Sequence, residues 1–190
     1  SSMALSLTIT GHRDAGFHGP KSTARESPMP PAEVTAPHQA RKDIRPLVEH
    51  IIRRYHDVHR AEFPAAIRLA RIVEAKFADE PLCPRGLADH LAVMADDLEG
   101  HQQREERHLF PTLMAGGCAV ARFPIRRMMA EHEEVHDQLL ALAALTQDFT
   151  ASQVADETWV ALYRLCRKLS VDLVEHMRLE NDELFAPFLN

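Results

Sequence analysis

Two residue pairs in this sequence have the types and the spacing to hold a metal ion. Glu105 follows His101 by four residues, and Glu180 follows His176 by the same interval. Residues at this spacing lie on one face of a helix, so an imidazole and a carboxylate can bind the same cation. Each carboxylate can also join two cations through its two oxygens. The pairs therefore predict two metal ions that the glutamates bridge and the histidines cap.

Three further histidines are candidate ligands. His56 and His132 interrupt the apolar stripes of two other predicted helices and would supply the remaining nitrogen donors. His136 follows His132 by four residues and is a candidate for a fifth nitrogen donor. Imidazole and carboxylate donors with open positions suit iron, although these donors also permit zinc or manganese. His59 shares a helix face with His56, where it is either an outer hydrogen-bond partner or part of the core.

Two other interpretations fit the pattern less well. A ferritin-like di-iron site needs two Glu-x-x-His pairs and one glutamate from each remaining helix. Glu105 and Glu133 each precede a histidine by three residues, but the first predicted helix has no glutamate on its inward face. A histidine phosphotransfer bundle would expose one histidine, whereas this pattern buries several. The metal-binding interpretation accounts for all the inward histidines together.

The candidate ligands belong to four predicted helices. Good helix formers, with apolar residues at steps of three and four, predict helices at about 43–78, 85–114, 123–147 and 154–187. Prolines and the Gly116-Gly117 pair separate the segments, and no segment has the pattern of a strand. Short connections between long helices favour antiparallel neighbours. The expected fold is therefore all-α, an up-down-up-down four-helix bundle.

The polar interruptions fall at similar heights in the predicted bundle. Counted from the connecting loops at about 1.5 Å per residue, candidate histidines on neighbouring helices differ in height by about 6 to 10 Å. This difference is comparable with the error of predicted helix ends. We therefore expect the polar residues to form one layer of the core. Burying them unpaired would cost several kcal/mol for each group, which a bound cation would offset.

The first 42 residues have a different character. Glycine, proline, serine and threonine are frequent there, and apolar residues follow no sustained period. Such a segment buries too little apolar surface to offset the entropy of ordering it. We expect a mobile, disordered N-terminal tail at 1–42 and one bundle domain at 43–190.

The bulk properties argue against several classes of function. The 190 residues carry a formal net charge of −6, which does not suit a nucleic-acid-binding surface. No apolar run approaches the roughly 18 residues that a membrane span requires. The three cysteines are widely spaced, which argues against a disulfide framework and against a Cys-x-x-Cys metal site. We expect a cytoplasmic protein with no nucleic-acid or membrane partner.

From residue 55 onward the chain resembles the hemerythrin-like family, and within it most closely the di-iron repair-of-iron-centres proteins. The strings that carry the resemblance are Tyr55–Arg60, Pro84–Leu87, His101–Glu106, Glu131–Glu134 and His176–Asn181. The resemblance implies a centre of two iron ions with an oxo or hydroxo bridge. The ligands that it implies are His56, His101, Glu105, His132, His176 and Glu180.

The sequence departs from that family in two respects. Full-length members carry a Cys-x-Cys motif in an N-terminal domain, whereas residues 1–42 contain no cysteine. His132 and His136 have the spacing of oxygen-carrying hemerythrins, in which the second histidine is a ligand. Those proteins end their ligand pattern with His-x-x-x-x-Asp, whereas this chain has His176-x-x-x-Glu180.

The resemblance also implies a function. We expect a protein of the nitrosative or oxidative stress response whose ferrous centre binds nitric oxide and which serves the repair of iron–sulfur proteins. His136 suggests the alternative of reversible dioxygen binding or sensing. A third hypothesis is enzymatic, with reduction of nitric oxide or turnover of peroxide at the same irons. We expect a small-ligand-binding metalloprotein rather than an enzyme.

Overall fold

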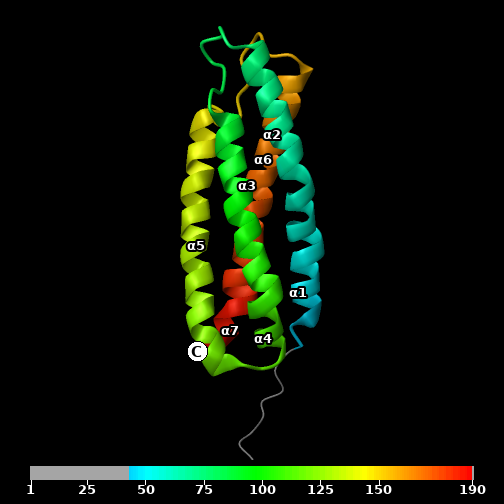
Figure 1. Cartoon of the computed structure of the whole chain (residues 1–190), viewed down its shortest axis with the longest axis vertical. Helices are drawn as coiled ribbons and strands as arrows, with labels where there is room; N and C mark the ends of the chain where they lie inside the picture. Colours follow the sequence, from blue (N-terminus) through cyan, green and yellow to red (C-terminus); the bar gives the residue numbers. More distant parts are fainter. Residues whose placement is uncertain (1–42, 190) are drawn as a thin grey trace, which may run out of the picture. The chain divides into compact units, whose positions relative to one another are not determined.

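Four helical rods run side by side in the computed structural model, which describes residues 43–189 (Figure 1). The first rod consists of α1 (Arg45–Ile51), the π-helical segment η1 (Ile52–His56) and α2 (Asp57–Lys76). The second consists of α3 (Leu87–Arg104), η2 (Glu105–Leu109) and α4 (Phe110–Met114). The third is α5 (Cys118–Leu145). The fourth consists of α6 (Glu157–Arg178), η3 (Leu179–Phe185) and α7 (Ala186–Leu189).

The order of contacts around the bundle follows the order of the chain. Helix α2 packs against α3 and α6, and α5 packs against the same two helices. The second and fourth rods are therefore diagonal partners, and the predicted up-down-up-down bundle is confirmed. The third helix begins at Cys118, earlier than the predicted residue 123, because it continues through Pro124. The proline removes one backbone hydrogen bond but does not end the helix.

Three of the four rods contain a π-helical segment. In such a segment the backbone N–H bonds reach five residues back, so each turn holds more residues than an α-helical turn. His56 is the last residue of η1, Glu105 is the first of η2, and Glu180 lies inside η3. Helix α5 is α-helical from end to end. These segments were not predicted from the sequence.

The apolar core consists of two clusters. The upper cluster in the view of Figure 1 includes Phe63, Leu91, Leu142 and Trp159. The lower cluster includes Ile51, Phe110, Ile125, Met128 and Phe185. Along every rod the candidate ligands fall between residues of the two clusters. The core is thus apolar above and below a single polar layer.

Local signals in the sequence account for several helix ends. The carboxylate of Asp156 accepts a hydrogen bond of 2.9 Å from the backbone N–H of Trp159 and caps α6. Gly86 precedes α3 with a φ of +86°, a conformation that glycine adopts readily. No helix within residues 43–189 combines the length and the apolarity that a bilayer crossing requires. The tail predicted at 1–42 lies outside the described residues.

Candidate metal centre

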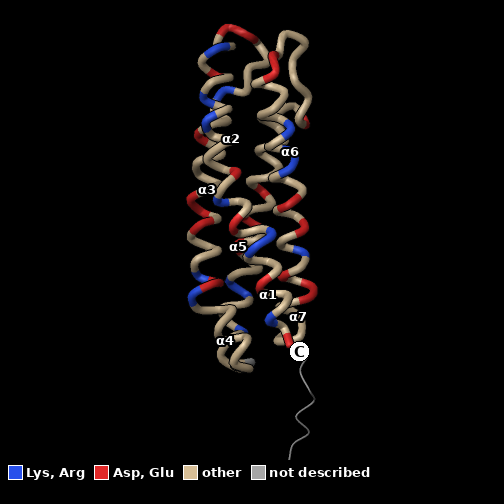
Figure 2. Tube along the Cα trace, turned by 90° about the vertical axis from the view of Figure 1, so that its right-hand side faces the viewer, with Lys and Arg blue, Asp and Glu red and all other residues tan. Residues whose placement is uncertain are grey.

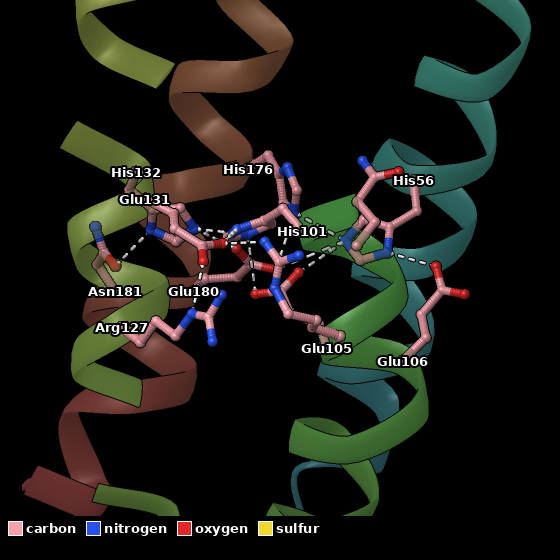
Figure 3. Close-up of polar contacts among 12 residues, drawn as sticks. His56, His101, Glu105, Glu106, Arg127, Glu131, His132, His176, Glu180 and Asn181 are labelled. Carbon is pink, nitrogen blue, oxygen red and sulfur yellow. Dashed lines mark hydrogen bonds and ion pairs between the residues drawn. The ribbon is translucent and has the colours of Figure 1, made fainter. Parts of the chain in front are cut away.

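Six of the seven predicted ligands meet inside the polar layer (Figure 3). They come from all four rods, and each side chain is at most 3% exposed. They are His56 from η1, His101 from α3, Glu105 from η2, His132 from α5, His176 from α6 and Glu180 from η3.

The six side chains form two overlapping groups of possible metal donors. One group contains His56 and His176, and the other contains His101 and His132. Both groups share Glu105 and Glu180, and within each group one donor atom from every residue lies within 4.8 Å of the others. Two adjacent ion positions with common carboxylates are therefore compatible with this geometry.

The oxygens of Glu105 are divided between the two groups. Oε1 lies 3.2 Å from His101 Nε2, and Oε2 lies 3.6 Å from His56 Nε2. Both oxygens are buried without a hydrogen-bond partner among residues 43–189. A buried carboxylate in this condition is costly, and cations on its two sides would satisfy it.

Glu180 divides its oxygens in the same manner. Oε1 lies 2.9 Å from His176 Nε2, and Oε2 lies 3.1 Å from His132 Nε2. Oε2 is close to this ring nitrogen, yet it has no hydrogen bond of acceptable geometry. Each glutamate is thus positioned to place one oxygen on each of two ions.

Pairs of histidine nitrogens also face each other in the layer. His56 Nε2 lies 3.0 Å from His176 Nε2, and His101 Nε2 lies 3.2 Å from His132 Nε2. Two imidazole lone pairs at such a distance need a cation or a proton between them. The donor set of this layer therefore fits metal ions.

Outer hydrogen bonds determine which nitrogen of three histidines faces the centre. The Nδ1–H groups of His56 and His101 donate to carboxylate oxygens of Glu106 and Glu131, at 2.7 and 2.9 Å. A carboxylate only accepts, so Nδ1 carries the proton and Nε2 keeps a free lone pair. His132 Nδ1 donates in the same way to Asn181 Oδ1, at 2.9 Å. Such outer partners orient metal-binding imidazoles.

His176 is held differently. Its Nδ1 is buried, and no described residue forms a hydrogen bond with it. Its ring stacks on Tyr55, with centroids 5.4 Å apart and an interplanar angle of 8°. Packing rather than an outer acceptor orients this histidine.

Arginines anchor the outer carboxylates. Arg104 donates to Glu131 at 2.6 Å, and Arg127 donates to its other oxygen at 2.9 Å. Burial opposes ionisation of Glu131, but the hydrogen bonds from Arg104, His101 and Arg127 outweigh it and lower its pKa to about 2. Glu131 thus stays an acceptor for His101 at neutral pH.

Protons and cations compete for the layer. Burial alone would lower the pKa of His56, but hydrogen bonds to Glu106 and Glu180 and the charge of Glu105 raise it to about 9. The pKa of His101 is also raised to about 9, because nearby carboxylates outweigh burial. Without a cation these imidazoles take up protons, and metal binding would release those protons.

The structure does not bring His136 to the other donors. The buried stripe of α5 runs from Met128 through His132 to Val135 and Leu139, and His136 is exposed. The inward position after His132 is three residues on, not four, because the stripe drifts around the helix. The prediction of a fifth nitrogen donor at His136 is corrected accordingly.

His59 lies beside the centre without joining either donor group. Its ring centroid is 5.6 Å from that of His176, and the amide of Gln102 lies 3.3 Å from its Nδ1. Burial, helped by the charges of His176 and His56, lowers the pKa of His59 to about 3. A neutral imidazole packed in the core, the second of the two alternatives for His59, fits this environment.

The outer partners were not predicted from the sequence, although each is the chain neighbour of a ligand candidate. Glu106 follows Glu105, Asn181 follows Glu180, and Glu131 precedes His132. A neighbour in a helix is turned by about 100°, which places it at the edge of the inward stripe. An acid or amide directly beside an inward ligand is the signal that would have identified them.

A comparison with protein families supports the arrangement. Residues 47–187 match the model of the hemerythrin HHE cation binding domain. The chain belongs to this family. The matched range includes all six side chains of the layer, so the hemerythrin domain here comprises the four rods and both candidate ion positions.

Curated relatives of this hemerythrin domain carry a more specific description. The chain is 44% identical over 139 residues to an iron-sulfur cluster repair protein YtfE of Dickeya chrysanthemi. That alignment covers 73% of this chain and 63% of the relative. This chain is also 40% identical over 155 residues to a protein of the same description from Yersinia pseudotuberculosis. That second alignment covers 80% of this chain and 70% of the relative. The chain thus spans about two thirds of the length of these relatives.

Proposed function

We propose that this chain holds two iron ions and binds a small ligand, nitric oxide, at them. The observation that carries the proposal is the division of each buried glutamate between two histidine pairs. Each ion position would receive two imidazole nitrogens and one oxygen from each glutamate. Bound ferrous iron would supply redox chemistry and coordination positions that the protein leaves open to a small ligand.

The residues of this chain would perform the remaining tasks. Glu105 and Glu180 would hold the ions at a fixed separation and offset half of their charge of +4. The outer acceptors Glu106, Glu131 and Asn181 would keep three imidazoles in the metal-binding tautomer. The two apolar clusters would limit the entry of water from above and below the layer. A centre of this kind favours a small uncharged ligand.

We place this activity in the nitrosative or oxidative stress response and in the repair of iron–sulfur proteins. The description of the relatives from Dickeya and Yersinia supports this role. The proposal keeps the cytoplasmic location expected from the sequence. It describes a ligand-binding metalloprotein, with reductive turnover of nitric oxide or peroxide as the enzymatic alternative.

Dioxygen binding now has less support. The hypothesis depended on His136 as a further nitrogen donor, and this side chain is exposed on α5. Nitric oxide binding does not require that ligand.

Metal analysis tests the centre itself. Protein from iron-replete cells is expected to contain about two irons per chain and to show the ultraviolet–visible bands of a bridged di-ferric centre. Zinc at full occupancy, or a single ion per chain, would contradict the proposal.

Anaerobic titration tests the ligand. Nitric oxide added to the ferrous protein is expected to give iron–nitrosyl absorption and electron paramagnetic resonance signals that saturate with the iron content. If the iron is present and no nitrosyl signal forms, the proposal of an iron centre is kept and the proposal that nitric oxide is its ligand is contradicted.

Substitution of the shared glutamates tests the bridging role. We expect Glu105→Gln and Glu180→Gln each to lose most of the iron, because one change removes an anionic oxygen from both ion positions. The matched control is Glu134→Gln, at an exposed position of α5. Circular dichroism should show the same helix content in all three variants. Full iron content in either bridging variant would refute the assignment.

A further inference from the structure

One part of the bundle has a charge opposite to that of the chain. Residues 107–130 contain four arginines and no aspartate or glutamate, in a sequence with a net charge of −6. This stretch ends the second rod and forms the first half of α5. The tube of α4 itself carries no acidic residue in Figure 2, whereas Asp43 and Glu183 lie near its end, in a pocket with Leu113 and Met114.

Large apolar side chains are exposed among these arginines. Phe123 is 79% exposed and Val120 is 74% exposed, both on α5. Arg126 and Arg127, one turn further along, are also exposed. Exposed aromatic and arginine side chains in one place are typical of protein interfaces.

A cavity of about 210 Å³ opens beside these residues. Its apolar lining includes Leu109, Val120, Phe123 and Met128. This volume has room for a large apolar side chain from outside. The exposed surface therefore combines an apolar recess with surrounding positive charge.

The charge beside the cavity is not fully neutralised. Arg104 and Arg127 both line the cavity, and both donate to the single carboxylate of Glu131. Two guanidinium groups on one carboxylate leave a net positive charge there. The side chains of Arg104 and Arg127 are 39% and 58% exposed, so an additional carboxylate arriving at this place can reach their guanidinium groups.

We propose that this face docks an acidic segment of a partner protein, with an apolar side chain of that segment seated in the cavity. We define the face by Arg104, Val120, Phe123, Arg126 and Arg127. Its charge and its recess complement a segment in which leucine or phenylalanine stands among aspartates and glutamates. Residues 1–42 of the chain suit the face poorly, because they contain five lysines and arginines but only three acids.

The docking face lies one side chain away from the metal centre. Glu131 receives hydrogen bonds from both arginines of the face and accepts one from His101. A partner carboxylate that engages Arg104 would draw it from Glu131. The inference goes beyond the proposed function and does not rest on it.

A labelled acidic peptide tests the docking face. The probe is a peptide of about twelve residues with leucines and a phenylalanine among aspartates and glutamates, titrated into the full chain by fluorescence anisotropy. We expect saturable binding that weakens strongly between low and high salt. The double variant Phe123→Ser with Arg126→Glu should weaken it by at least about tenfold.

Matched controls separate docking from general charge effects. Val93→Ser with Arg68→Glu replaces an exposed apolar residue of α3 and an exposed arginine of α2 by the same two residue types, and this variant should bind the peptide as the parent does. Equal binding by the parent and the Phe123 double variant would overturn the proposal, as would no binding by the parent. Sedimentation velocity that shows self-association only with Phe123 intact would assign the face to a second copy instead.

The same experiment keeps this proposal apart from the proposed function. Peptide binding is measured with metal-depleted and iron-loaded protein, since the face contains none of the candidate ligands. Binding that depends on Phe123 in a protein without iron would support docking while the iron proposal fails. A normal iron content without peptide binding would support the iron proposal while the docking proposal fails.

Discussion

Single hydrogen bonds outside the layer determine how the candidate ligands are presented. His56 and His101 each donate to a carboxylate, His132 donates to an amide oxygen, and His176 relies on stacking against Tyr55. The two candidate ion positions therefore have different surroundings. One has Glu106 behind His56, and the other has Glu131 behind His101 and Asn181 behind His132.

This difference predicts that each outer glutamate serves one ion. Glu131→Ala removes the acceptor of His101, so the ion beside His101 and His132 should bind about 10- to 100-fold more weakly. Glu106→Ala should have the same effect on the ion beside His56. A chelator competition with ferrous protein should show one ion leaving early in each variant.

Glu134→Ala, at an exposed position on the helix of Glu131, is the control and should release both ions as the parent does. Equal weakening of both ions in either outer variant would show that the two positions are not separately supported.

At the residue scale the sequence predicted much of the site. Six residues that it proposed do meet in the layer, because steps of four placed histidine and glutamate on inward stripes. His136 was assigned inward by the same rule, but α5 turns Val135 inward in its place. The outer partners lie at stripe edges, and a stripe alone does not distinguish an edge residue that reaches inward from a solvated one.

Between elements, a network of ion pairs joins the first and fourth rods close to the layer. Arg54 donates to both oxygens of Asp172, at 3.0 and 2.8 Å, and Lys168 donates to Asp172 at 2.8 Å. Asp172 itself is 5% exposed. Burial opposes its ionisation, but Arg54 and Lys168 outweigh it and hold the pKa of Asp172 below its ordinary 3.8.

A lowered pKa makes the contribution of Asp172 dependent on pH. Stabilisation by this carboxylate is complete above the unfolded-state pKa and is lost as the pH falls through the lower folded-state value. Asp172→Asn should reduce the free energy of unfolding by about 1 kcal/mol near pH 7, because solvent screens Arg54 and Lys168. Urea unfolding should show the difference shrinking below about pH 4.

Asp137→Asn, an exposed site on α5, is the control and should leave the unfolding curve unchanged at both pH values. A difference that grows on acidification would contradict the role of an ionised Asp172.

The helical rods were predictable as elements, but their π-helical segments were not predicted. The signal was nevertheless present in the spacing of inward residues. Buried positions advance by three successive steps of four from Ile51 to Phe63, from His101 to Leu113 and from His176 to Phe188. In a straight α-helix such a run would drift by about 120° and leave the core. Helix α5 alternates steps of three and four and stays α-helical.

In the whole molecule, the two apolar clusters provide most of the stability, and the polar layer between them holds the candidate metal donors. The two apolar clusters bury large side chains such as Trp159 and Phe185 on either side of the polar layer. Burial of such side chains is the main driving force of folding. The bundle is therefore expected to persist without its ions, although the six donors would then repel one another or bind protons.

Removal of the ions should lower the stability of the bundle without unfolding it. Treatment with a chelator is expected to leave the far-ultraviolet circular dichroism unchanged at 25 °C and to lower Tm. An ion present at one hundred times its Kd contributes about 2.7 kcal/mol per site. Hydrogen exchange should accelerate most in η1, η2 and η3, which carry His56, Glu105 and Glu180.

Loss of helix at 25 °C after chelation would show that the clusters cannot maintain the fold alone. An unchanged Tm would show that the ions do not link the four rods.

The π-helical segments make the centre sensitive to chain length as well as to residue identity. Each segment contains one more residue per turn than an α-helix. This extra residue keeps the inward side chains of the rod facing the core on both sides of the polar layer. Losing one residue from η2, for example the exposed Arg107, would leave every donor in the chain. In the straight α-helix that remained, the inward residues would follow one another at steps of four, three and four from His101, which keeps them on one face and keeps α4 against the lower cluster. Only the wide turn beside Glu105 would be lost. In this architecture a single-codon deletion therefore separates two requirements, because it would spare all six donors and the bundle while removing the local shape in which Glu105 is presented.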